Sequence, residues 1–308
     1  MGEKASLKIG HLRITDHLIL GIVKHKLDKG EISLSHSQID TIAMTGWNDI
    51  GDALNSGEID IAFMLAPFAM ETFNLKQNIR LILFSHKSGS IIVTNKRANI
   101  SKLEDFKGKT ILIPYHLSVH HMIIDKLLTE KGLTTGVGKD VIFEVIAPSQ
   151  IPEVIEWDKD GDIGGFIVAE PFGTQVVNAG MGNEFALSKD IWPNHPCCVI
   201  VARDEIIGKY TDALHELTQH LVQAGMFIND NTAEAAKIGA EFLNQKIDVM
   251  QKVLTQPADR VTTTELFPTH KDLDTMQTYL TTKISAMSNK IDLDKFIDTQ
   301  FAKAAGAK

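Results

Sequence analysis

The chain has 308 residues, of which 44% are apolar, and this is enough to bury the cores of roughly two domains. Its formal charge is 31 minus 39, or -8, and it lacks a stripe of Lys and Arg with interleaved aromatic residues, which argues against nucleic acid as a partner. No apolar stretch reaches the roughly 20 residues that are needed to span a bilayer. Residues 1–10 lack the apolar segment of a secretory signal, so we expect either a cytoplasmic protein or one whose signal has been removed.

The N-terminal part of the chain alternates predicted strands and helices, a pattern typical of an α/β domain. Residues 7–12 form the first predicted strand, and the polar turn from Arg13 to Asp16, which includes Thr15, caps a helix over 17–27. Further strands are predicted within residues 33–44, 59–65 and 79–84.

Three bulky residues follow the strands of this first predicted lobe. Trp47 opens the helix after the second strand, and Pro67 and Phe68 follow the third. In open α/β sheets, ligands bind in the loops beyond the carboxyl ends of the strands. We therefore expect these residues to line a small-molecule pocket, although a Trp at such a position most often packs into the core.

One theme occurs twice in the chain. The segments NSGEIDIAFMLAPFAM (55–70) and GDIGGFIVAEPFGTQ (161–175) each run from an acidic Gly turn through an apolar run to Pro-Phe. Each apolar run is too short for a surface helix and predicts a buried strand of a parallel sheet. Two lobes with similar strand ends, including Glu170 and Phe172 in the second, could close on a small molecule by hinge motion. The alternative is that both segments are ordinary sheet core.

The second lobe is predicted to be an insertion, with residues 1–92 and 197–308 forming lobe 1 and residues 93–196 forming lobe 2. A loop with His116, Ser118 and His120 opens a helix in this lobe. The free N–H groups and positive dipole end of such a helix favour an anion, and the side chains could add donors. The helical patterns after residue 204 are expected to buttress lobe 1.

No metal or cofactor is expected, because the histidines lack the spacing of HExxH or CxxC sites. His86 and His195 could join His120 only if the fold brings the lobes together. The adjacent Cys197 and Cys198 cannot staple distant parts of the fold and are expected to be buried strand residues. A redox pair or a soft-metal site is the alternative.

Five segments carry a family resemblance: residues 57–70, 99–128, 164–182, 195–207 and 290–305. They are similar to the nitrate/sulfonate/taurine-type solute-binding proteins of ABC transporters, above all to the nitrate- and bicarbonate-binding branch. The resemblance implies a two-lobed, type II periplasmic-binding-protein-like α/β fold with C-terminal helices on the first lobe. It implies hinge closure on a small, anionic ligand such as nitrate, a sulfonate, taurine or bicarbonate.

The resemblance also has consequences for site, location and partners. It places Trp47, the His120 region and Glu170 in ligand-facing loops. It implies a periplasmic or extracytoplasmic, lipid-anchored protein that delivers its ligand to an ABC permease, with the signal sequence absent from this chain. One segment departs from the branch, because Cys197 and Cys198 stand where nitrate binders offer a basic residue. A larger ligand, or an anion without a lysine partner, therefore stays open.

We predict a monomeric binding protein without catalysis and without a nucleic-acid partner. The predicted ligand-binding residues are Arg13, Thr15, Trp47, Pro67, Phe68, His116, Ser118, His120, Glu170, Phe172 and His195. One rival function is an enzyme on the same fold that acts on a pyrimidine- or menaquinone-type precursor. Another is a ligand-sensing subunit that contacts a receptor.

Overall fold

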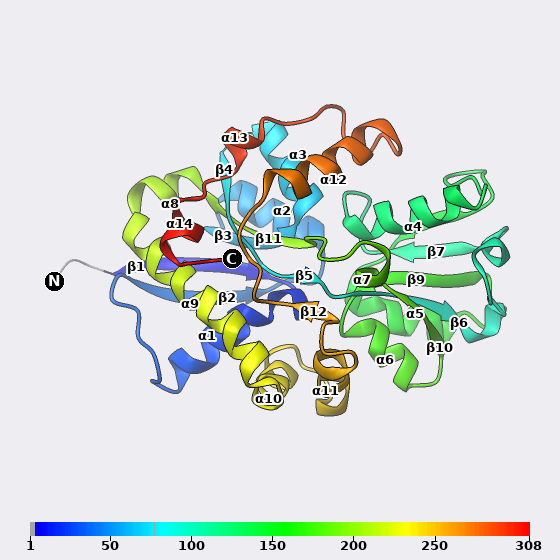
Figure 1. The fold of residues 1–308 in the computed structure, drawn as a ribbon, viewed down its shortest axis with the longest axis horizontal. Coiled ribbons are helices and arrows are strands. Elements are labelled where there is room, and N and C mark those ends of the chain that lie inside the picture. Colours follow the sequence, from blue (N-terminus) through cyan, green and yellow to red (C-terminus); the bar gives the residue numbers. More distant parts are fainter. Residues whose placement is uncertain (1–3, 77) are drawn as a thin grey trace.

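Two five-stranded mixed sheets divide the molecule into two lobes (Figure 1). The computed structural model describes residues 4–76 and 78–308. The first sheet has the order β2-β1-β3-β11-β4 and the second the order β10-β6-β9-β7-β8. The strands of the first are β1 Ala5–His11, β2 Ser37–Ala43, β3 Ile61–Leu65, β4 Ile79–Phe84 and β11 Cys198–Arg203. Those of the second are β6 Ser90–Asn95, β7 Thr110–Ile113, β8 Ile142–Val145, β9 Ile163–Ala169 and β10 Gly182–Leu187.

Helices cover both sheets. In the first lobe these are α1 Leu18–Asp28, α2 Trp47–Ser56, α3 Ala66–Lys76, α8 Asp204–Lys209, α9 Thr211–Asp230, α10 Thr232–Phe242, α11 Ile247–Thr255, α12 His270–Thr282, α13 Leu293–Phe296 and α14 Gln300–Ala304. In the second they are α4 Val119–Glu130, α5 Ile151–Trp157, α6 Phe172–Asn178 and α7 Ser188–Ile191. Short 3-10 turns lie at Thr15–His17, Lys96–Ala98, Leu103–Phe106 and Pro148–Gln150.

The parallel strands of each lobe end at the edge that faces the other lobe. β1 pairs parallel with β2 and β3, and β7 pairs parallel with β8 and β9. All five residues of β3 are buried, as expected for a strand covered by helices on both faces. The predicted two-lobed α/β fold is therefore confirmed.

The chain crosses between the lobes beside one short sheet. β4 leads through β5 (Lys87–Ser88) into β6, and β10 leads through α7 into β11. β5 also pairs with β12 (Val261–Thr262), so a C-terminal segment lies against the first crossing. β6 pairs with β9 from Ser90 to Thr94, within the second sheet. The exact lobe limits at 92/93 and 196/197 stay a prediction.

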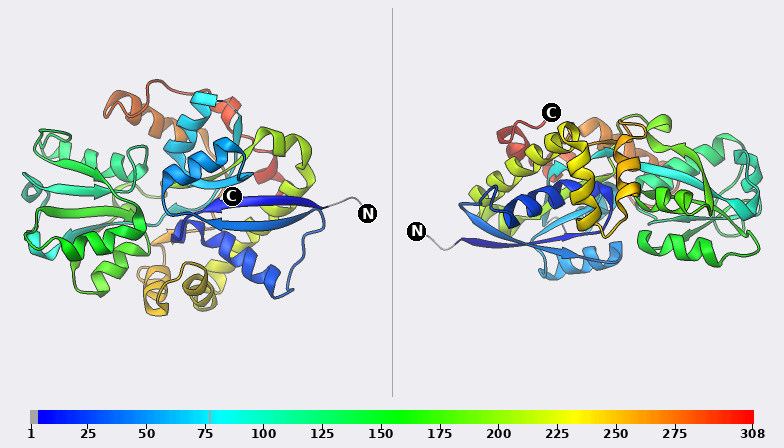
Figure 2. Two further views of the ribbon diagram at one scale, coloured as in Figure 1. Left: turned by 180° about the vertical axis from the view of Figure 1, so that it is seen from behind. Right: turned by 90° about the horizontal axis from the view of Figure 1, so that it is seen from below.

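The C-terminal helices contact both lobes. α9 and α10 pack on α1, and α14 packs on α9 and β4 of the first lobe. α11 also contacts α6, and α12 contacts α4, so both reach the second lobe. Figure 2 shows the two lobes side by side along the long axis of the molecule. No helix in the described ranges combines the length and hydropathy that a membrane crossing requires.

Candidate functional site

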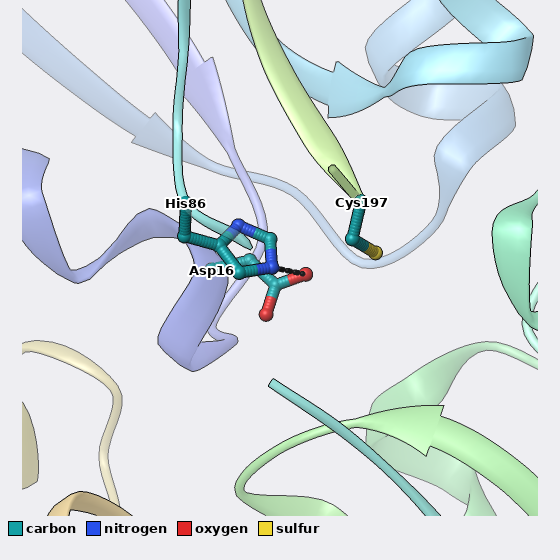
Figure 3. A group of neighbouring side chains, drawn as sticks. All are labelled: Asp16, His86 and Cys197. Carbon is teal, nitrogen blue, oxygen red and sulfur yellow. Dashed lines mark ion pairs between the residues drawn. The ribbon is translucent and has the colours of Figure 1, made fainter. Parts of the chain in front are cut away.

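Three chain segments meet where the lobes touch. The loop after β1 supplies Asp16, the first crossing supplies His86, and the residue before β11 supplies Cys197 (Figure 3). Asp16 is 1% exposed, and His86 and Cys197 are fully buried. The three residues flank β1, β4 and β11 of the first sheet, so the packing of that sheet brings them together at the edge that faces the second lobe.

The three side chains present different donor atoms to one another. A carboxylate oxygen, an imidazole nitrogen and a thiol sulfur from these residues all lie within 4.8 Å of one another. Nε2 of His86 is 3.2 Å from Oδ2 of Asp16. His86 Nε2 nevertheless has no hydrogen-bond partner, so the two atoms lie close together without forming a hydrogen bond. The Cys198 thiol donates to the same Asp16 oxygen at 3.4 Å. We call Asp16, His86 and Cys197 the interlobe triad.

Two further buried histidines lie around the triad. His120 comes from α4 of the second lobe, and its Nε2 is 2.9 Å from Ser90 Oγ and 3.9 Å from Cys197 Sγ. His195 lies in the second crossing, with Nδ1 3.2 Å from the Pro196 carbonyl oxygen. The structure brings His86, His195 and His120 into one buried region, and a shared ligand role for these histidines stays a prediction.

Several polar atoms of this region have no protein partner. They are Asp16 Oδ1, both ring nitrogens of His86, His120 Nδ1 and His195 Nε2. Leaving a buried polar group unpaired costs about 1–3 kcal/mol, so native proteins keep few of them. A concentration of such atoms at one place indicates a ligand site.

Burial keeps the groups of this region neutral in the protein alone. It raises the pKa of Asp16 to about 8, against hydrogen bonds from the two thiols that lower it. Burial lowers the pKa of His86 and of His120 to about 3 and that of His195 to about 4. It raises the pKa of Cys197 to about 11. A bound cation would reverse this preference, because it favours the anionic forms of the carboxyl and the thiol.

Gly89 leaves room beside the triad. Its φ is +88°, a left-handed conformation that favours glycine. A Cβ at this position would lie 3.2 Å from His86 Cδ2 and 3.5 Å from Asp16 Oδ1. A larger residue would therefore strain the backbone and crowd the donor atoms.

An ion-pair network built on the buried Arg260 and Glu170 lies next to the triad, with Glu184 at its exposed edge. Arg260 Nη1 donates to Glu170 Oε1 at 2.6 Å, and Nη2 donates to Glu184 Oε2 at 2.9 Å. Glu170 also accepts from the Thr174 amide and hydroxyl at 2.9 and 2.8 Å. Its carbonyl oxygen accepts from the Thr15 hydroxyl at 2.6 Å, which ties the lobes together.

An open pocket of about 290 Å³ lies between the loops of the two lobes. It is lined by Leu12, Arg13, Ile14, Ala43, Met44, Thr45, Pro148, Ser149 and Phe172. Arg13 is exposed there, whereas Phe172 is 6% exposed. A larger hollow of about 700 Å³ between α4 and α12 includes the exposed His116. We place the candidate site at the triad, because the unpartnered atoms lie there.

Four other predicted ligand-binding residues make packing or capping contacts within the protein. Trp47 is 2% exposed and lies edge-on to His17 at 6.0 Å, with its Nε1 unpartnered. Phe68 contacts Tyr115, with ring centroids 4.9 Å apart. Pro67 is buried in the first turn of α3. Ser118 caps α4, since its hydroxyl accepts from the His121 amide and donates to the Tyr115 carbonyl. A ligand role for each stays a prediction.

Sequence reasoning left Asp16 and Arg260 out of the ligand site, and it named His86 and Cys197 only as alternatives. Asp16 was expected only to cap a helix, and Cys197 to be a buried strand residue. The one available signal for the site was the presence of His86, His195, Cys197 and Cys198 at the predicted crossings. Arg260 carried no local signal, because its partner Glu170 is 90 residues away.

Comparisons with known proteins agree on one family. A family model described as NMT1-like matches residues 1–244. The nitrate/nitrite binding protein NrtA of Nostoc sp. is 23% identical over 258 residues, which cover 77% of this chain and 57% of that protein. The nitrate import ATP-binding protein NrtC of Synechocystis sp. is 27% identical over 244 residues, which cover 74% of this chain and 36% of that protein. The chain thus spans between about a third and three fifths of the length of these relatives.

Solved structures share the fold. The ligand-binding component of an ABC-type import system from Staphylococcus aureus, solved with zinc bound, superposes with a TM-score of 0.86 at 24% identity. That match covers 98% of this chain and 99% of the other. The periplasmic nitrate-binding protein NrtA from Synechocystis PCC 6803 gives a TM-score of 0.74 at 17% identity, covering 99% of this chain and 86% of the other.

Proposed function

The chain belongs to the NMT1-like family, and on this premise we propose that it is the solute-binding protein of an ABC importer. It captures a small ligand between its lobes and presents the closed form to a membrane permease. The observation that carries the proposal is the group of buried, unpartnered polar atoms at the meeting point of the lobes. Similar proteins named for nitrate binding and ABC import support it.

Closure explains how the ligand is held. The contacts that join the lobes include the Thr15–Glu170 bond and a bond from the Tyr115 hydroxyl to Asn48 Oδ1 at 2.8 Å. Opening at the crossings would break these contacts and expose the triad to solvent. Closing would desolvate the ligand, which strengthens its polar contacts. A population shift toward the closed form then follows from the ligand's differential affinity.

The chemical class of the ligand is the open part of the proposal. The nitrate, bicarbonate and sulfonate named for similar proteins are the first anionic candidates, and the zinc of the S. aureus component is a cationic one. Within residues 4–76 and 78–308, the buried cationic side chains Lys87 and Arg260 both have carboxylate partners. A bare anion would therefore enter a region without a spare buried positive charge.

Binding without catalysis is part of the proposal. The thiol of Cys197 has its pKa raised to about 11, and the nearby histidines are held neutral with low pKa values. A protonated thiol next to weakly basic histidines is poorly suited to nucleophilic catalysis. The rival enzyme acting on a pyrimidine- or menaquinone-type precursor would consume its ligand.

Partners and location follow from the proposed role. We propose a monomer that docks on an ABC permease outside the cytoplasm, held there by a lipid anchor. The formal charge of -8 supports the absence of nucleic acid from its partners.

The test combines ligand binding with lobe closure. We would screen the purified chain by thermal shift against nitrate, bicarbonate, sulfonates, taurine, pyrimidines and Zn²⁺, and measure the radius of gyration by X-ray scattering with each hit. A ligand at about 100 times its Kd should stabilise the protein by about 2.7 kcal/mol and raise the Tm by several degrees. The proposal requires a smaller radius with the ligand recovered unchanged. A chemically altered ligand would favour the enzyme, and unaltered scattering with every hit would contradict closure.

A further inference from the structure

We infer that the interlobe triad of Asp16, His86 and Cys197 binds a divalent transition-metal ion, for which Zn²⁺ is the representative probe. The inference deepens the proposed function by giving its ligand a chemical class, and it rests on that function only for the transport role. The binding step can be tested separately.

The donor set fits such an ion. The triad offers one carboxylate oxygen, one imidazole nitrogen and one sulfur, and all three can lie within 4.8 Å of one another. In a tetrahedral zinc site with bonds of about 2.0–2.3 Å, neighbouring donors are roughly 3.3–3.8 Å apart. The 3.2 Å between His86 Nε2 and Asp16 Oδ2 is close to that spacing. Sulfur and imidazole favour zinc and other transition metals over Mg²⁺ and Ca²⁺.

The polar atoms of the triad that lack hydrogen-bond partners also favour a metal ion. Asp16 Oδ1 and both ring nitrogens of His86 have no partner, although both side chains are buried. An ion contacting Asp16 Oδ1 and one ring nitrogen of His86 would give each of these two residues a partner at once. A neutral solute would need several separate hydrogen bonds to do the same.

The second lobe places a further histidine nitrogen beside the triad, although His120 is outside the group whose donor atoms all lie within 4.8 Å of one another. His120 Nε2 lies 3.9 Å from Cys197 Sγ and is held by the Ser90 hydroxyl at 2.9 Å. His120 belongs to α4, whereas Asp16 belongs to the first lobe. An ion that contacts both residues would couple metal binding to lobe closure. Such a fourth position completes the usual coordination of zinc.

Burial makes opening a condition for entry. Asp16, His86, Cys197 and His120 are at most 1% exposed, so an ion reaches them only when the lobes separate. Coordination of the Cys197 sulfur displaces its thiol proton to the buffer, and no redox change is involved. The exchange of the ion should therefore be slow in the closed form.

The experiment uses the full chain, stripped with a chelator and kept reduced. Zn²⁺ would be titrated against a chromophoric competitor, and Co²⁺ would be added to look for the thiolate-to-cobalt charge-transfer band. We expect a single ion per chain and a sulfur band. The variants Cys197→Ser, His86→Ala and Asp16→Asn should each lose more than about 100-fold in affinity, since outer-shell changes alone cost 10–100-fold. His120→Ala should lose less than these three.

Matched controls separate ligation from general damage. Cys198→Ser alters the neighbouring buried cysteine, and His121→Ala alters a histidine that is 9% exposed in the same helix as His120. His121→Ala should keep affinity within about tenfold, whereas Cys198→Ser should lose about 10–100-fold, less than a direct ligand, because its thiol donates to Asp16 Oδ2. Circular dichroism would verify that each variant is folded. Equal Zn²⁺ affinity in the Cys197→Ser, His86→Ala and Asp16→Asn variants, or the absence of the cobalt band, would overturn the site.

The outcome also distinguishes the two proposals. Zn²⁺ binding that depends on the triad but leaves the radius of gyration unchanged would support the metal site and contradict the closure proposal. Closure on an anion, with no Zn²⁺ binding, would overturn the metal site and leave the proposed function standing.

Discussion

Two groups of polar side chains lie where the lobes meet, and they differ in how completely their buried members are paired. In the network of Arg260, Glu170 and Glu184, the guanidinium also donates twice to the Gln256 carbonyl oxygen, at 2.9 and 2.6 Å from Nε and Nη2. In the interlobe triad, by contrast, Asp16 and His86 retain atoms without partners. The two groups touch the same turn, because the Gly89 amide donates to the Arg260 carbonyl at 2.9 Å.

The contrast indicates that the ion-pair network has a structural role and that the triad has a ligand-binding role. A buried charge pair that is satisfied within the protein holds the lobes in one register, and removal of either partner exposes an uncompensated charge. A group that lacks partners is ready to contact a ligand, and its side chains add little to the stability of the protein alone. The following changes test this difference.

The largest effect should come from the network. Arg260→Met leaves Glu170, which is fully buried, without its cationic partner. We expect the free energy of unfolding to fall by about 3–5 kcal/mol in urea denaturation. The double variant with Glu170→Gln should recover part of that loss. A loss below about 1 kcal/mol in the single variant would mean that the network is not a structural tie.

A buried histidine outside both groups sharpens the comparison through pH. His11 is 2% exposed, with Nδ1 3.0 Å from the Leu12 carbonyl, and burial lowers its pKa to about 4 from 6.5. The unfolded chain binds a proton near pH 6.5 that the folded chain binds only near pH 4. The stability is therefore full above pH 6.5 and falls as the pH drops toward 4, by about 3 kcal/mol for this residue.

The variant His11→Phe should remove that dependence while it keeps the stacking on Phe242, at 4.8 Å between ring centroids. Unfolding free energies of the metal-free protein between pH 6.5 and 4 would be compared for both chains. We expect the slope of the unfolding free energy against pH to decrease by the amount that corresponds to about one proton. An unchanged slope would show that His11 is already protonated in the folded protein.

A cross-lobe contact at the rim should matter less. Tyr115→Phe removes the solvent-exposed hydrogen bond to Asn48 and keeps the ring contact with Phe68. We expect a loss of about 0.5–1 kcal/mol, read as a rise of less than about fivefold in the Kd of whichever ligand closes the lobes. A rise above about tenfold would assign Tyr115 to the binding site itself.

The smallest effect on stability should come from the triad. In the metal-free protein, Asp16→Asn should change the free energy of unfolding by less than about 1 kcal/mol at pH 7. The reason is that the raised pKa of about 8 leaves the carboxyl mostly protonated, and an amide of similar shape replaces it. A loss above about 2 kcal/mol would place Asp16 with the structural network, and urea denaturation beside Arg260→Met measures the contrast directly.

Much of the fold could be predicted because its signals are local. The apolar run at 163–169 predicts β9, and the structure has the strand at Ile163–Ala169. The run at 59–65 predicts β3, which spans Ile61–Leu65. At the matching strand ends, however, the two Pro-Phe motifs differ in their surroundings. Phe68 packs on Tyr115, whereas Phe172 lines the open pocket between the lobes.

The site itself could be predicted only in part. Glu170 was predicted from its place at a strand end, and its contact with the Thr174 amide joins residues only four positions apart. Its partner Arg260 was not anticipated, and neither was the meeting of Asp16 with Cys197. These contacts join segments that no periodicity or spacing connects.

The sequence by itself determined the elements and their order, the two similar strand ends and the family resemblance, because apolar period, turn residues and caps act over a few neighbouring positions. Only the tertiary structure decided which polar side chains share a buried space. Asp16 and Cys198 are 182 residues apart in the chain and 3.4 Å apart between carboxylate oxygen and sulfur. Asp16 follows β1 and Cys198 begins β11, so the strand order of the first sheet sets that distance, and burial gives these groups their neutral forms and their unpaired atoms.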